Sequence, residues 1–188
     1  MPAHVASADY AVRRFAEDPG FVSGVVRFDV PLLGEVAGLR GVHLQCHIGT
    51  DTVSLARLGA SMTGVDFSAP AVAAARELAA AAGADATFVQ ADVYDAADVL
   101  EQGSFDLVYT GIGALCWLPS VRRWARVVAA LLDAGMRITG LAEHDSVPWN
   151  ALPGMMTETG GEWRLSENPA RLPCSFTIQA VKDERYPR

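Results

Sequence analysis

The stretch between residues 41 and 68 is the part of the sequence that most constrains the fold. It contains an apolar strand at 42–46, a short loop ending at Gly49, an amphipathic helix, a second strand at 61–65 and then Asp66. A strand, tight loop and helix followed by a carboxylate about 20 residues past the loop is the layout of a nucleotide-type cofactor site. Such a carboxylate can bind both hydroxyls of a ribose, while the helix N-terminus offers unpaired backbone N–H groups.

Strands and helices alternate over most of the chain. Apolar runs typical of strands lie at 42–46, 61–65, 87–92, 105–110, 136–141 and 175–181, and helical periodicity lies at 9–17, 22–35, 50–58, 71–82, 93–102 and 121–132. This alternation predicts an α/β fold, a doubly wound and mostly parallel sheet of six strands with helices on both faces. Ligands bind at the carboxyl ends of strands in such sheets. Gly49, Asp66, Asp92 and Thr110 fall at these ends, so we expect them to form one site.

The chain is expected to form one domain with three segments. Residues 1–40 predict an N-terminal helical cap, residues 41–141 a cofactor-binding core, and residues 142–188 an irregular segment with a final strand. Residues 142–174 are rich in Pro, Gly, Glu and Trp and show no clear period. A stretch this long without regular structure indicates either a functional covering loop or a missing element.

Composition and charge narrow the classes of partner. The net charge of −7 disfavours a nucleic acid or an anionic membrane as the main partner, because both require clustered Lys and Arg. No apolar run is long enough to span a bilayer and no leader segment is evident, so we expect a cytoplasmic protein. The three cysteines, Cys46, Cys116 and Cys174, lack the spacing of a disulfide framework or a zinc site, so we expect reduced thiols.

Two acidic residues have a binding interpretation and a structural one. Asp66 is placed for the hydroxyls of a ribose; the alternative is an N-cap of the next helix, for which Ser68 is better placed. Asp92 could accept a hydrogen bond from the exocyclic amine of a purine while the Val93 N–H meets a ring nitrogen. The alternative for Asp92 is again helix capping.

The loop after the first strand is short of glycines. His47 is expected to line the cofactor cleft or bond to the loop, replacing a glycine whose absence pushes the backbone away from the ligand. His43 lies in the first predicted strand and is expected to be a core histidine. Cys46 is expected to be a small, buried apolar side chain. With no second ligand at metal spacing, a metal site is not expected. Trp117 could either cover a ligand or form a hydrophobic staple for the next helix.

Together these positions resemble the class I S-adenosylmethionine-dependent methyltransferases over roughly residues 41–141. The family's Gly-x-Gly-x-Gly turn falls on residues 45–49, where Gln45 and His47 replace two glycines, a pattern similar to an uncharacterised bacterial subgroup. The resemblance implies S-adenosylmethionine as the cofactor. It places cofactor binding on Cys46, His47, Gly49, Asp66, Phe67, Ser68, Asp92, Val93, Thr110 and Gly111.

The resemblance also implies a strand order. Family members have seven strands in the order 3-2-1-4-5-7-6, whereas six are predicted here, so one helix and one strand are expected to be skipped near Leu132. Strands one to four would build the cofactor site.

The first functional hypothesis is methyl transfer from S-adenosylmethionine to a small molecule. Proximity can accelerate such a displacement without a catalytic dyad. No catalytic residue is assigned; Tyr10, His47, Tyr109 and His144 are candidates for a base. A second hypothesis is a non-catalytic or degenerate cofactor-binding module that pairs with a partner or with itself, and a homodimer stays open. A nicotinamide dehydrogenase is disfavoured because Gly-x-Gly-x-x-Gly is absent.

Overall fold

The computed structural model describes residues 10–132, 135–169 and 174–183. Its helices are α2 Val12–Glu17, α3 Gly24–Leu33, α4 Thr50–Arg57, α5 Ala69–Ala82, η2 Val93–Asp95, α6 Ala96–Val99, η3 Leu115–Trp117 and α7 Val121–Leu132. Its strands are β1 Arg40–Leu44, β2 Ser61–Asp66, β3 Ala86–Gln90, β4 Leu107–Thr110, β5 Gly135–His144, β6 Ser146–Val147, β7 Met156–Thr159, β8 Glu162–Leu165 and β9 Ser175–Asp183. The two η elements are short 3-10 helices.

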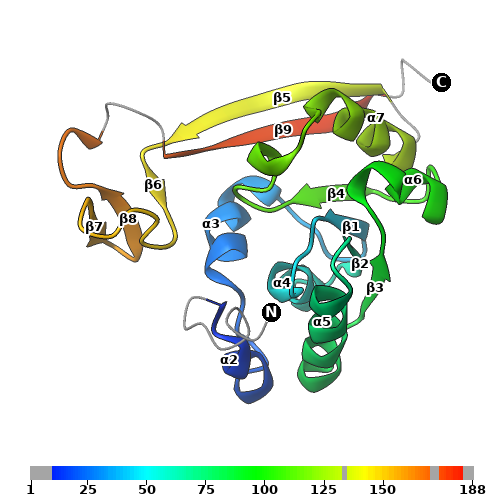
Figure 1. Cartoon of the computed structure of the whole chain (residues 1–188), viewed down its shortest axis with the longest axis horizontal. Coiled ribbons are helices and arrows are strands. Elements are labelled where there is room, and N and C mark those ends of the chain that lie inside the picture. Colours follow the sequence, from blue (N-terminus) through cyan, green and yellow to red (C-terminus); the bar gives the residue numbers. More distant parts are fainter. Residues whose placement is uncertain (1–9, 133–134, 170–173, 184–188) are drawn as a thin grey trace.

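A parallel sheet forms the centre of the molecule (Figure 1). Its strand order is β3-β2-β1-β4, and each neighbouring pair is parallel. This is the order 3-2-1-4 that the resemblance to the family implied for the first four strands. The α/β fold class is confirmed, and the carboxyl ends of all four strands lie along one edge, because parallel strands share their direction.

Helices pack on both faces of this sheet because the side chains of a strand alternate between faces. Val42 and Leu44 of β1 lie in one cluster with Ala96 of α6 and with Val128 and Leu131 of α7. On the opposite face, Met62 of β2 and Tyr109 of β4 pack with α3 and α4 in a second cluster. Burial on both faces explains the near-continuous apolar strands in the sequence.

The remaining strands form two antiparallel sheets. β5 pairs with β9, and β6, β8 and β7 form a three-stranded sheet beyond it (Figure 1). No described strand pairs with the outer edge of β4. The parallel sheet therefore has four strands and not six: after α7 the chain returns as β5, whose hydrogen-bonding partner is the last strand, β9.

The expectation of an irregular stretch at 142–174 was wrong for part of that segment. Gly160 and Gly161 both have positive φ, 66° and 85°, and join β7 to β8 in a tight hairpin. Two consecutive residues with positive φ are what a type I′ turn requires. The strands on either side of this turn, β7 and β8, are too short and too polar to show the alternating apolar pattern of a strand.

The ends of α2 and α3 are tied to the parallel core. The Arg57 guanidinium donates hydrogen bonds to the backbone carbonyls of Phe15, Asp18 and Phe21. At the other end of α3, the Gln179 amide of β9 donates to the Leu32 carbonyl, which attaches the antiparallel pair to this helix. None of the helices in the described ranges has the length and apolar character needed to cross a bilayer.

Candidate functional site

The loop after β1 has an unusual backbone. Gln45, His47 and Gly49 have φ of 60°, 51° and 82°, so three alternate residues adopt the left-handed conformation. This conformation strains any residue except glycine by about 1 to 2 kcal/mol. The sequence predicted that the replacement of a glycine by His47 would push the backbone away from the ligand; in the structure both Gln45 and His47 keep the backbone conformation that glycine favours.

Asp66, at the end of β2, holds this loop in place. Its Oδ2 accepts a hydrogen bond from the His47 N–H and its Oδ1 accepts one from the Ser68 N–H, both at 2.9 Å. Each carboxylate oxygen has a second lone pair available for a ligand. Ser68 starts α5 without a capping bond from its side chain, so the capping role predicted for that hydroxyl is absent in this part of the structure.

Gly49 allows the loop to lie against the sheet. A Cβ at this position would lie 2.8 Å from the Cβ of Ala75 and 2.9 Å from a ring carbon of Phe88. Such distances are too short for carbon atoms in contact. The single remaining glycine of the loop is therefore required both by its φ and by its surroundings.

The next positions along the strand ends are open to solvent. Phe67 is 73% exposed, with its carbonyl bonded to the Gln90 amide. Asp92 caps the short helix η2, its Oδ1 accepting a hydrogen bond from the Tyr94 N–H at 2.9 Å. The capping interpretation of Asp92 is thus present in the structure. The other carboxylate oxygen of Asp92, next to the buried Val93, has no hydrogen-bond partner among the described residues.

The end of β4 faces the same loop. The Gln45 amide nitrogen donates to the Ala114 carbonyl at 3.2 Å, which links the loop after β1 to the loop after β4. The Gln45 Oε1 and Thr110 Oγ1 atoms are buried and have no hydrogen-bond partner within the described residues. Buried polar atoms are nearly always satisfied, so these two are candidates for ligand contacts.

A cavity of about 510 Å³ opens between these loops. Its wall combines the loop after β1, the starts of α3 and α4, the loop after β4, and Pro148 and Trp149 from the antiparallel part. The structure brings the predicted residues Cys46, His47 and Gly111 into this wall. The predicted residues Asp66, Phe67, Ser68, Asp92 and Val93 lie beyond it, at the ends of β2 and β3.

A polar cluster lies at the base of the cavity. His43 is 2% exposed, and its Nδ1 is 2.9 Å from the Thr52 hydroxyl. Burial lowers the pKa of His43 to about 3, so its ring is neutral. Burial raises the pKa of Asp51 to about 6, partly opposed by a hydrogen bond from Ser23. The Tyr109 hydroxyl donates to Asp29 at 2.6 Å, and its ring contacts that of His43.

The four candidate bases differ in their position relative to the cavity. Tyr10 and His47 line the cavity, and their rings lie 5.3 Å apart. Tyr109 is buried, and burial raises the pKa of its hydroxyl far above the usual value. His144 lies outside the wall, against Phe28 and the Thr177 hydroxyl.

Cys46 is 3% exposed, and burial raises the pKa of its thiol, as expected for a buried apolar residue. Trp117 is 83% exposed and lines the cavity, which does not fit a hydrophobic staple. No group of three or more His, Cys, Asp or Glu in the described ranges is arranged to hold a metal ion.

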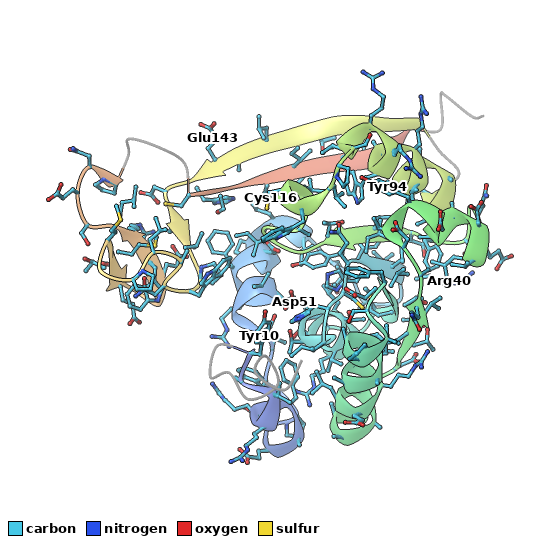
Figure 2. The ribbon with its side chains drawn as sticks, in the orientation of Figure 1. Tyr10, Arg40, Asp51, Tyr94, Cys116 and Glu143 are labelled. Atoms are coloured by element: carbon cyan, nitrogen blue, oxygen red, sulfur yellow. The ribbon has the colours of Figure 1, made fainter. Side chains whose placement is uncertain are left out.

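Sequence reasoning missed Asp51 and Gln45. Asp51 is the second residue of α4, where an acid complements the helix dipole in many proteins, so its residue type gave no separate signal. Figure 2 shows Asp51 in the middle of the molecule, on the side where Tyr10 lies. Gln45 occupies a position where the family has glycine, and this substitution was the signal that could have identified it.

Comparison with known proteins gives one family. A family model described as a methyltransferase domain matches residues 42–138. An S-adenosylmethionine-dependent methyltransferase from Mesorhizobium loti has a similar structure, with a TM-score of 0.51 and 32% identity over 65% of this chain. A putative methyltransferase of the same kind from Methanococcus maripaludis has a TM-score of 0.55 and 17% identity over 69% of this chain, a likeness of fold.

The chain spans 54% and 58% of the lengths of those two proteins. A search of curated protein sequences gives no match. The family model begins within β1 and ends within β5, so the matched part contains nearly all of the parallel sheet and the loops after β1 and β4. The start of α3 and the residues Tyr10, Pro148 and Trp149, which also line the cavity, lie outside it.

Proposed function

Because the chain belongs to the class I S-adenosylmethionine-dependent methyltransferases, we propose that it transfers the methyl group of S-adenosylmethionine to a small molecule. The observation that carries this proposal is the loop after β1. Gln45, His47 and Gly49 keep three left-handed residues where the family has glycines, although two of them are strained there. Backbone strain of this kind is typical of functional sites.

The ends of β2 and β3 fit the adenosyl part of the cofactor. Asp66 retains lone pairs for the ribose hydroxyls after bonding to the loop. The exposed ring of Phe67 offers a flat apolar surface to a base, and Asp92 has one carboxylate oxygen free for an exocyclic amine. Ser68 contributes through its backbone, which its N–H attaches to the Asp66 carboxylate by a hydrogen bond.

The cavity fits the other end of the cofactor and the acceptor. Its volume of about 510 Å³ lies in the usual range for small-molecule sites. In its wall, the Gln45 Oε1 has no hydrogen-bond partner among the described residues, and Gly111 lets the backbone approach a ligand. The unpaired Thr110 Oγ1 lies at the end of β4, next to Gly111. Cys46 and His47 complete the wall on the side of the loop.

Positioning is the main contribution that these residues make to the reaction. When bound, S-adenosylmethionine would supply a methyl group on a positively charged sulfur; the acceptor would bond to the methyl carbon as the carbon–sulfur bond breaks, with S-adenosylhomocysteine as the leaving group. The walls around Gly111 and Trp149 align the acceptor and exclude water, which can supply much of the acceleration. The acidic net charge and the concave shape of the cavity favour a small molecule over a nucleic acid as the acceptor.

Titration calorimetry with S-adenosylmethionine and S-adenosylhomocysteine tests the proposal. The wild type is expected to bind both, and Asp66→Ala to weaken both about 100-fold, because it removes the ribose contact and loosens the loop. Asp98→Asn, which removes a carboxylate from exposed positions on α6, is the matched control. Absence of binding to the wild type would refute the proposal.

A radiolabelled methyl donor and a panel of small metabolites test the transfer itself. The expected result is labelled product with the wild type and a strongly reduced rate with Asp66→Ala. Cofactor binding without product across the panel would instead favour a binding module. That second hypothesis is supported by the outer edge of β4, which pairs with no strand in the described residues.

A further inference from the structure

A second, smaller cavity lies between α7 and the short helices η2 and α6. It has a volume of about 240 Å³, and its wall is formed by Tyr94, Ala97, Arg123, Arg126 and Val127. None of these residues lines the larger cavity at the loop after β1. Figure 2 shows Tyr94 below α7 and apart from Tyr10 and Asp51, which line that larger cavity.

We propose that this second cavity binds the phosphate group of a small molecule between the guanidinium groups of Arg123 and Arg126. The inference concerns a site that is separate from the residues assigned to the cofactor and the acceptor. It therefore does not rest on methyl transfer.

The cavity owes its positive charge to a cluster of arginines on α7. Arg122, Arg123 and Arg126 lie within five residues, and no other five-residue stretch of the sequence contains three basic residues. All three lie in the first two turns of α7, and the first turn contains no acidic residue. Positive side chains are unfavourable there, because the helix dipole is positive at the N-terminus. A bound anion would compensate this arrangement.

Arg123 is held in position by an aromatic ring. Its guanidinium carbon lies 4.2 Å from the centroid of the Tyr94 ring. The Tyr94 hydroxyl accepts a hydrogen bond from the Ser120 N–H at 2.8 Å and donates one to the Ser120 carbonyl at 3.2 Å. The Tyr94 N–H is bonded to Asp92. Because Tyr94 is fixed at both ends, Arg123 loses less conformational freedom when a ligand binds.

The donors of both guanidinium groups are available. Within the described residues, neither Arg123 nor Arg126 uses its side chain in a hydrogen bond or an ion pair. Asp95 of η2 and Asp98 of α6 are on the elements beside the cavity, yet neither pairs with these arginines. Side chains three residues apart on a helix are neighbours, so the two arginines can bind one ligand group together.

The chemistry of the wall favours phosphate over other anions. The planar guanidinium fork matches the oxygens of a carboxylate or a phosphate, and two such forks match a group with two charges and more than two oxygens. A phosphate monoester is mostly a dianion at pH 7.5, because its second pKa is about 6.

The rest of the wall limits the size of the ligand. Ala97 and Val127 are apolar, and the volume of about 240 Å³ is below the range of about 300 to 1,000 Å³ for sites of drug-sized ligands. The cavity therefore fits a phosphate with a short organic substituent. Free inorganic phosphate shares the same chemistry, so the experiment includes both sources.

The test is an NMR titration of the ¹⁵N-labelled full chain at pH 7.5 and constant ionic strength. The probes are inorganic phosphate, phenyl phosphate, benzoate and benzyl alcohol. Phenyl phosphate is expected to bind with a Kd of about 1 mM and to shift the amides of η2 and of the first turns of α7. Benzoate should bind about tenfold more weakly, and benzyl alcohol should not shift these amides. The ratio between phenyl phosphate and inorganic phosphate identifies the source of the phosphate group.

Arg126→Gln is the main variant, because Arg126 is exposed and its substitution leaves the core unchanged. It should weaken phenyl phosphate about tenfold, and Arg123→Gln should do the same. Arg122→Gln is the matched control: it removes the same charge from the same end of α7, but Arg122 does not line the cavity. It should weaken the ligand less than twofold. Amide spectra without ligand show whether each variant keeps the fold.

Localised shifts together with weaker binding in Arg126→Gln but not in Arg122→Gln support the inference. Three results overturn it: no shift in the wild type at about 20 mM phenyl phosphate, equal weakening by Arg122→Gln, or benzoate binding as tightly as phenyl phosphate. The last two would show a general positive surface and not a phosphate site. The proposed function is tested by cofactor binding, so its failure would leave these results unchanged.

Discussion

The parallel sheet and the antiparallel strands β5 to β9 differ in how they are covered. In β1, Val42 and Leu44 are fully buried and helices pack on both faces of the sheet. In the β5 and β9 pair, Leu141 and Ile178 face each other across the strands and are 67% and 54% exposed. The first region is a closed core, whereas the second has an apolar surface open to solvent.

This difference corresponds to a division within the site. The ends of the parallel strands supply Asp66 and Gly49, which are fixed by backbone hydrogen bonds and close packing. The antiparallel part supplies Pro148 and Trp149, and Pro148 lies near Gly24 at the start of α3. A rigid region therefore carries the proposed cofactor contacts, and a second region completes the wall where an acceptor would lie.

The largest expected effect contrasts the stability of the two regions. Leu44→Ala should lower the free energy of unfolding by about 3 kcal/mol, because it leaves a cavity in a closed core. Leu141→Ala, the same change at an exposed position, should lower it by less than about 0.5 kcal/mol. Urea unfolding followed by circular dichroism measures both. Equal losses would show that Leu141 is buried in solution, for example by a second copy of the chain.

The same contrast explains what the sequence could predict of the fold. The prediction of a strand at 61–65 agrees with β2 Ser61–Asp66, because a strand buried on both faces leaves an apolar run between turn residues. The β7 and β8 hairpin was missed: its strands are short and half-exposed, so only the Gly160–Gly161 pair marked it. The return of β5 to β9, and not to β4, depends on contacts between distant residues that no local pattern encodes.

The site was predictable to a similar extent. Asp66 could be singled out because its spacing from the loop is a local property of the sequence. The structure places it at the end of β2, bonded to the loop, and its contact with a ribose stays a prediction. Asp51 was not singled out, because its importance comes from His43 and Gly111, which only the fold brings near it. The replacement of a glycine by His47 was predicted to push the backbone away from the ligand. The local sequence did not indicate that His47 would keep a left-handed φ, because that conformation is strained for any residue except glycine.

A pH titration tests the role of Asp51 at the base of the cavity. Asp51 lines the cavity and has a pKa of about 6, so its carboxylate changes from ionised to neutral when the pH is lowered from 7.5 to 5. If the ionised form attracts the ammonium end of S-adenosylhomocysteine, which 5′-methylthioadenosine lacks, this change should weaken S-adenosylhomocysteine about tenfold relative to 5′-methylthioadenosine. The titratable groups around Asp51 are Asp29, His43, Cys46 and Tyr109. Burial lowers the pKa of His43 to about 3 and raises those of Cys46 and Tyr109, so these three stay neutral.

Asp29 acts in the same direction as Asp51, because burial raises its pKa as well. Calorimetry at intervals across this pH range measures the ratio of the two affinities. Asp51→Asn should show a nearly constant ratio. A wild-type ratio that also stays constant would remove Asp51 from ligand binding.

A smaller effect concerns the stability cost of this carboxylate. The folded pKa of about 6 exceeds the ordinary value of 3.8, so the folded state binds more protons between these values and ionised Asp51 destabilises the fold above pH 6. Asp51→Asn should therefore stabilise the protein by about 1 kcal/mol at pH 7.5 and have no such effect below pH 4. Thermal unfolding of both variants at the two pH values measures this. A destabilised variant at pH 7.5 would mean that the bonds from Ser23 and Thr50 outweigh the burial cost.

The smallest expected effect tests the antiparallel side of the cavity. Trp149 lines the cavity but lies far along the chain from the strand ends that carry Asp66, so Trp149→Ala should change the affinity for S-adenosylhomocysteine less than twofold. If an amine binds there, the loss of one ring face should weaken benzylamine about threefold, the expected size of a partly exposed cation–π contact. Trp163→Ala in β8, outside the cavity wall, is the matched control. A loss of S-adenosylhomocysteine affinity as large as that of Asp66→Ala would contradict the division between the two regions, because the antiparallel strands would then hold the cofactor itself.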